Sequence, residues 1–97
     1  MKKSRFYHLY ISPRKGVDPT EVTRTLASCT DYSQYDTHNF ALYTVFDAKE
    51  WYARLQPHVE PGGKLFICEL NTDDYWGYMN SGLWKMLKST KEHQAKK

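Results

Sequence analysis

The sequence predicts a single α+β domain whose elements follow the order β-α-β-β-α-β. Four short segments are rich in aromatic and β-branched residues, as strands are, and two longer segments carry apolar residues at helical spacing. Proline and glycine separate these segments. A chain of 97 residues is long enough for one hydrophobic core but too short for two independent domains.

The first strand and helix are joined by a loop that runs from residue 12 to residue 18. The run FYHLYIS, residues 6–12, predicts a central strand, and SPRKGVDP after it contains two loop-forming residues, Pro13 and Gly16. Asp18 precedes Pro19, which is the usual order for an N-cap and the first helical residue. The sequence therefore predicts a helix over 19–29. Its apolar face holds Val22, Leu26 and Cys29.

A hairpin and a second helix follow, and a fourth strand completes the order. We expect hairpin strands over 32–35 and 40–45, around a polar turn that contains Asp36 and His38. Asp47 can cap a helix over 48–59, and the break EPGG separates that helix from the strand KLFICEL, residues 64–70.

The predicted order of elements is that of a ferredoxin-like sandwich, in which two helices cover one face of an antiparallel sheet. The expected core spans about 6–70, an aromatic helical extension spans 71–90, and a basic tail spans 91–97. The strands carry apolar residues on both faces, so the second face needs a cover. We expect a homodimer that meets through the sheets or the extensions; the alternative is a monomer whose extension folds over its own sheet.

Charge and cysteine content limit the class of protein. The net charge is +3, but residues 6–87 carry seven basic and ten acidic side chains, a net charge of −3, so the basic residues lie toward the ends. The two cysteines, Cys29 and Cys68, fit no metal-binding spacing and are expected to be free thiols. With neither an apolar leader nor a membrane-length apolar run, we expect a cytoplasmic protein without membrane contact.

The sequence contains no motif that defines an enzyme. Walker, Rossmann, nucleophile-elbow and zinc-spacing patterns are all missing. His8 is expected to be a hydrogen-bonded core or interface residue, and His38 a turn residue. We therefore expect no cofactor, no metal and no catalytic residue.

One stretch of the chain resembles a known family. In WYARLQPHVEPGGKLFICEL, a helix ends in Leu-x-Pro-His, a glycine-containing break follows, and a strand ends in Glu-Leu. This organisation resembles the small SinR-like proteins of the CRISPR-associated Cas-two superfamily, over about residues 6–88. The resemblance implies a ferredoxin-like homodimer whose C-terminal segment helps to bind the partner subunit.

The resemblance also gives a reason to doubt nuclease activity. Nucleases of this family place a metal-binding aspartate at the end of the first strand, and the matching residue here is Ser12, with Asp18 the nearest acid downstream. A hydroxyl is a poor ligand for Mg²⁺, and the nearby Arg14 and Lys15 oppose cation binding. Instead, the loop offers donors to a phosphate or a carboxylate. The candidate anion-binding or nucleic-acid-binding residues are Ser12, Arg14, Lys15 and Gly16.

Three functions are compatible with these observations. The leading one is a non-catalytic homodimer that contacts nucleic-acid backbone or a component of a CRISPR or antiviral defence complex. The second is a Mg²⁺-dependent endoribonuclease of the Cas-two type that uses Asp18, Asp36 or Asp73. The third is a phage or mobile-element protein that inhibits a host defence factor by protein contact. The expected dimer or partner contacts are Tyr75, Trp76, Tyr78, Trp84 and Leu87.

Overall fold

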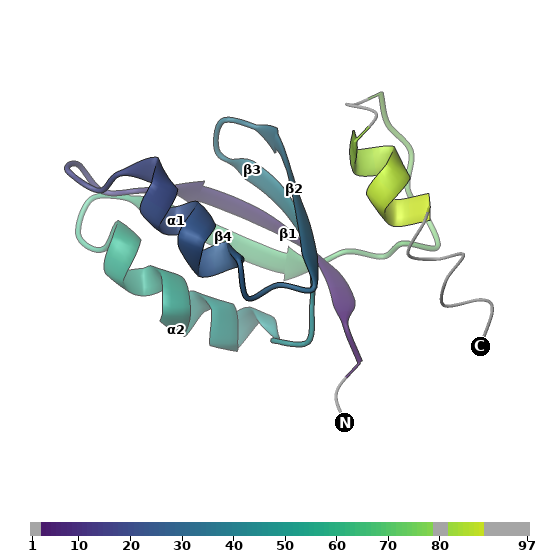
Figure 1. The fold of residues 1–97 in the computed structure, drawn as a ribbon, viewed down its shortest axis with the longest axis horizontal. Coiled ribbons are helices and arrows are strands. Elements are labelled where there is room, and N and C mark those ends of the chain that lie inside the picture. Colours follow the sequence, from purple (N-terminus) through teal and green to yellow (C-terminus); the bar gives the residue numbers. More distant parts are fainter. Residues whose placement is uncertain (1–2, 79–81, 89–97) are drawn as a thin grey trace.

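The computed structural model describes residues 3–78 and 82–88 and shows an α+β globule built on a four-stranded antiparallel sheet. The elements follow the predicted order (Figure 1). They are β1 (Arg5–Ser12), α1 (Pro19–Leu26), β2 (Asp31–Asp36), β3 (Asn39–Thr44), α2 (Ala48–Val59) and β4 (Lys64–Glu69). A further helical segment covers residues 82–88.

The sheet has the strand order β2-β3-β1-β4, so β1 is a central strand, as predicted. Along β1, Tyr10 lies opposite Asn39 of β3 on one side and opposite Phe66 of β4 on the other. Two residues further, Ser12 lies opposite Lys64. Because directly opposed residues point to the same face of a sheet, this register assigns each strand residue to one of two faces.

The first face carries the main core, under α1 and α2, which Figure 1 shows together on one side of the sheet. Trp51 of α2 is fully buried there, and its indole Nε1 donates a hydrogen bond to the Thr44 hydroxyl at 3.1 Å. That bond satisfies the one polar atom of the indole, as burial requires. The other buried members of this core are Tyr7, Leu9, Ile11, Val22, Leu26, Phe40, Leu42, Leu55 and Val59.

Helix α1 is shorter than predicted. The sequence predicts a helix to residue 29, whereas α1 ends at Leu26, with Ala27 as its C-cap. The thiol of Cys29 lies just past the helix and still packs against the main core, and burial raises its pKa to about 12. The spacing of Cys29 from Val22 and Leu26 therefore predicted correctly that Cys29 packs against the core, but it predicted wrongly that the helix extends to residue 29.

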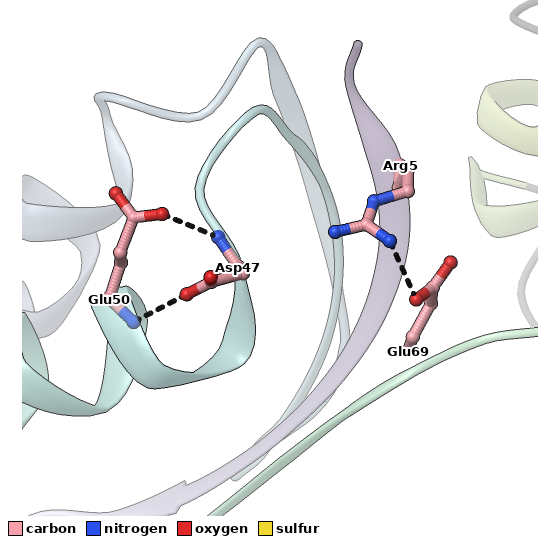
Figure 2. Close-up of polar contacts among 4 residues, drawn as sticks. All are labelled: Arg5, Asp47, Glu50 and Glu69. Atoms are coloured by element: carbon pink, nitrogen blue, oxygen red, sulfur yellow. Dashed lines mark hydrogen bonds and ion pairs between the residues drawn. The ribbon is translucent and has the colours of Figure 1, made fainter. Parts of the chain in front are cut away.

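The two helix N-caps are those that the sequence predicts. Asp18 accepts hydrogen bonds from the backbone N–H and the hydroxyl of Thr20 at the start of α1. Asp47 and Glu50 form a reciprocal capping box at the start of α2, drawn in Figure 2 beside the Arg5–Glu69 ion pair that joins β1 to the end of β4. These contacts fix where each helix leaves the sheet.

The second face is half covered by the chain itself. Leu83, Met86 and Leu87 of the helical segment 82–88 are buried against Phe6 and Ala41 of the sheet. Figure 1 shows this segment away from α1 and α2, reached through the chain that follows β4. The extension therefore folds over the sheet of its own chain. The basic tail, residues 91–97, lies outside the described residues.

Candidate functional site

The helical segment 82–88 divides the second face into two parts of different chemistry. Its aliphatic side chains cover the end of the face that holds Phe6, Ala41 and Leu70. The other end holds three rings, an amide and a lysine, and we call it the open strip. The open strip consists of Tyr10, His38, Asn39, Lys64 and Phe66.

The open strip crosses three strands. Phe66 of β4 is 60% exposed and lies opposite Tyr10 of β1. On the other side of Tyr10, the His38 ring lies with its centroid 5.8 Å from the tyrosine ring. A half-buried tyrosine is thus flanked by an exposed phenylalanine and a histidine, which gives a row of three rings across the sheet surface.

His8 and Cys68 mark the border between the open strip and the covered part of the face. They lie opposite each other, two residues along β1 and β4 from the Tyr10 and Phe66 pair. His8 Nδ1 is hydrogen-bonded to the Tyr35 hydroxyl, and burial lowers the pKa of the imidazole and raises that of the tyrosine. The expectation that His8 is hydrogen-bonded is therefore confirmed.

The loop after β1 lies at the same end of the sheet as Lys64. A Cβ on Gly63 would lie 2.5 Å from the Ser12 carbonyl oxygen and 2.9 Å from the Arg14 nitrogen, so only glycine allows the loop to approach the start of β4 this closely. The loop that carries Arg14 and Lys15 therefore packs against the start of β4, where Lys64 lies.

The four predicted anion-binding residues play different parts in this loop. The backbone N–H of Arg14 donates to the His58 carbonyl at 2.8 Å, and its Nε donates to the Pro57 carbonyl at 3.3 Å. Arg14 therefore anchors the loop to the C-terminal end of α2, where a cation is favourable. Gly16 has φ +93° in the turn closed by the Val17 N–H on the Arg14 carbonyl, a geometry that glycine adopts readily. Lys15 is exposed on that turn, and Ser12 is half-buried opposite Lys64.

The five predicted partner-contact residues also divide into two groups. Leu87 is buried on the sheet of its own chain, and the Trp84 ring stacks on Tyr75 with centroids 6.0 Å apart. In contrast, Trp76 is 97% exposed and Tyr78 is 100% exposed. Beside them lies a mainly apolar cavity of about 260 Å³, whose lining includes Tyr35, Leu70, Tyr75, Trp76 and Trp84.

The three aspartates of the nuclease alternative lie in different parts of the protomer. Asp18 caps α1, Asp36 ends β2, and Asp73 follows β4. The carboxylate of Asp36 accepts hydrogen bonds from the Thr37 backbone and the Asn39 amide. Within residues 3–78 and 82–88, no three histidine, cysteine or acidic side chains lie close enough together to hold a metal ion.

Sequence reasoning did not identify the open strip. Tyr10 and Phe66 are 56 positions apart in the chain, and their alignment depends on the register of β1 with β4. A usable signal was present in KLFICE, where Lys64, Phe66 and Cys68 share one face by alternation.

Comparison of the chain with protein-family models, with curated proteins and with solved structures finds no match. None of the described helices is long and apolar enough to cross a membrane.

Proposed function

We propose that this protein is a non-catalytic, homodimeric, Cas-two-like binding protein with a ferredoxin-like fold that contacts the backbone of a nucleic acid. The observation that carries this proposal is that two exposed lysines belong to the end of the sheet where the open strip lies, Lys64 at the start of β4 and Lys15 on the loop that packs against that start. Lysine and arginine side chains hold phosphate groups without regard to base sequence. A CRISPR or defence complex, as the resemblance implies, is the setting in which such binding would operate.

The same end of the sheet favours binding over hydrolysis. Ser12 occupies the end of β1, opposite Lys64 and close in sequence to Arg14 and Lys15. A hard divalent cation prefers carboxylate oxygens, whereas Ser12 offers a hydroxyl and its partner across the strands, Lys64, carries a positive charge that repels such a cation. The local charge is suited to a phosphate rather than to the metal that would cleave one.

Two exposed aromatic residues support the homodimer. Trp76 and Tyr78 lie on the segment between β4 and the helical segment 82–88, and their side chains are almost fully exposed in the single protomer. Tryptophan and tyrosine are enriched at the centres of protein interfaces. We propose that these two residues contact the partner subunit, while Trp84 and Leu87 pack within their own chain and hold the extension on the sheet.

The experiment that tests the proposal measures binding and cleavage in the same samples. Labelled RNA and DNA of defined sequence are titrated with protein between 50 and 300 mM salt, with and without Mg²⁺, and the nucleic acid is then analysed for cleavage. We expect binding that weakens as salt rises, the signature of phosphate contacts, and intact nucleic acid. Mg²⁺-dependent cleavage lost in the Asp18, Asp36 or Asp73 to Asn variants would favour the endoribonuclease instead.

A complete lack of binding at physiological salt would overturn the nucleic-acid proposal. In that case, tight association with a purified host defence factor would favour the inhibitor function. The paired substitution Lys15→Gln and Lys64→Gln provides the internal check, because the proposal requires it to weaken binding. Lys49→Gln on α2 is the matched control, since Lys49 is exposed on the helical side of the protein.

A further inference from the structure

We infer that the nucleic acid bound by this protein is single-stranded and that its bases stack on Phe66 and Tyr10 of the open strip. This inference rests on the proposed function and adds the class of ligand and the way in which it is held. A four-stranded sheet with exposed aromatic rings is a surface on which unpaired bases stack. The bases of a duplex are already stacked on each other and offer no free faces to such a surface.

The division of the second face is the first observation behind the inference. Aliphatic side chains of the extension cover Phe6 and Ala41, where the sheet itself is apolar. They leave Phe66 60% exposed and Tyr10 half-exposed. Phe66 lies on the edge strand β4 opposite Tyr10 of the central strand β1, so the two rings form one exposed patch, and such a patch indicates a surface that binds another molecule.

The chemistry of the open strip distinguishes a base from an aliphatic protein surface. Phe66 and Tyr10 provide ring faces, whereas Asn39 and His38, next to Tyr10, provide hydrogen-bonding groups. Unpaired bases need both kinds of contact, because they stack through their faces and hydrogen-bond through their edges. Part of the Asn39 amide already contacts Asp36, at 3.5 Å, which holds the amide at the edge of the strip.

The charges are arranged to complement a single strand. Lys64 lies two residues before Phe66 on the same face of β4, and it is exposed. Lys15, exposed on the turn after β1, adds positive charge beyond the end of the sheet. A phosphate held by these cations would leave its attached base within reach of the Phe66 ring, so the two kinds of contact belong to one path. On the opposite side of the strip, the Asp36 carboxylate accepts from Thr37 and Asn39.

The test makes two comparisons. It compares the affinity for single strands with that for duplexes, and it compares the loss of an aromatic ring from the open strip with the loss of a ring from another surface. Fluorescence anisotropy is measured with labelled 12-nucleotide RNA and DNA single strands and with the corresponding duplexes, at one salt concentration. The variant is Phe66→Ala, whose side chain is too exposed to be required for folding. The matched control is Tyr52→Ala, an aromatic residue of α2 that is 44% exposed.

We expect the single strands to bind at least about tenfold more tightly than the duplexes. Phe66→Ala should weaken single-strand binding roughly tenfold, as loss of one stacking contact does, and Tyr52→Ala should have no effect. If single strands and duplexes bind equally and Phe66→Ala has no effect, while Lys15→Gln with Lys64→Gln still weakens binding, the stacking inference fails and the proposed function stands.

The remaining outcomes are also decisive. If the wild-type protein binds none of the probes, the proposed function fails and the inference fails with it. Sedimentation of wild-type and Phe66→Ala protein measures self-association, and so tests whether a second copy of the chain occupies the open strip. Loss of self-association in the variant, with unchanged single-strand binding, would show that the open strip is a dimer contact and would overturn the inference.

Discussion

The Nε of Arg14 donates a hydrogen bond to the Pro57 carbonyl at 3.3 Å, so this arginine holds the loop after β1 against the end of α2. Its neighbour Lys15 is exposed on the turn. The structure therefore separates two adjacent cations that the sequence alone treats alike. Arg14 acts mainly on the position of the loop, and Lys15 acts on what the loop binds.

The first prediction follows from this separation. Arg14→Ala should lower the free energy of unfolding by about 1 kcal/mol, because it removes a charged donor from the helix end. Lys15→Ala, the matched control, should leave stability within about 0.5 kcal/mol of wild type and weaken nucleic-acid binding. Urea denaturation of both variants tests the first part; equal stability losses would contradict it.

The capping box of α2 provides a second prediction. The Asp47 carboxylate accepts from the Glu50 N–H at 2.8 Å, while the Glu50 side chain accepts from the Asp47 N–H (Figure 2). Asp47→Ala should cost about 1 kcal/mol of unfolding free energy, and Asp47→Ser should recover most of it, since serine also caps helices. Equal midpoints for wild type and Asp47→Ala in urea would show that the cap contributes nothing.

A third prediction concerns the cover on the second face. Leu87 is 4% exposed against the sheet, so Leu87→Ala should cost about 2 to 3 kcal/mol. The adjacent Lys88→Ala, at an exposed position, should be nearly neutral. The Leu87→Ala loss should also be independent of protein concentration, because the contact lies within one protomer. A loss that changes with concentration would show that the segment 82–88 covers the sheet of the partner instead.

The fourth prediction is a pH dependence due to His8. Burial lowers the pKa of this imidazole below its ordinary value of 6.5, so in acid the unfolded chain binds a proton that the folded protein resists. Stability should therefore fall as the pH decreases through about 6.5, and not rise. His8→Gln should flatten this fall between pH 7.5 and 5.5, because the glutamine amide does not titrate. Identical slopes for both proteins, from thermal unfolding at each pH, would contradict the assignment.

Local sequence signals predicted most of the elements, because these elements depend on neighbouring residues. The bounds of α2 are those predicted from Asp47 and from the break after residue 59. The predicted end of α1 was wrong, since the helix ends at Leu26 and Cys29 packs against the main core from the segment that follows it. The prediction that one face of the sheet needs a further cover is confirmed by Leu83, Met86 and Leu87.

The candidate site could be predicted only in part. The basic loop after β1 is visible in the sequence, but its association with Lys64 depends on the register of β1 with β4. The exposure of Phe66 depends on where the extension stops covering the sheet, and that is a property of tertiary packing. No local pattern carries either kind of information.

The central claim is that a nucleic acid lies along the open strip, and the most direct measurement is a ¹H–¹⁵N NMR titration of the full chain with a 12-nucleotide single strand. We predict that the largest shift changes fall on Tyr10, Lys15, His38, Lys64 and Phe66, and that the exposed face of α2 around Tyr52 stays unchanged. A spectrum that does not change, or changes confined to α1 and α2, would contradict the account.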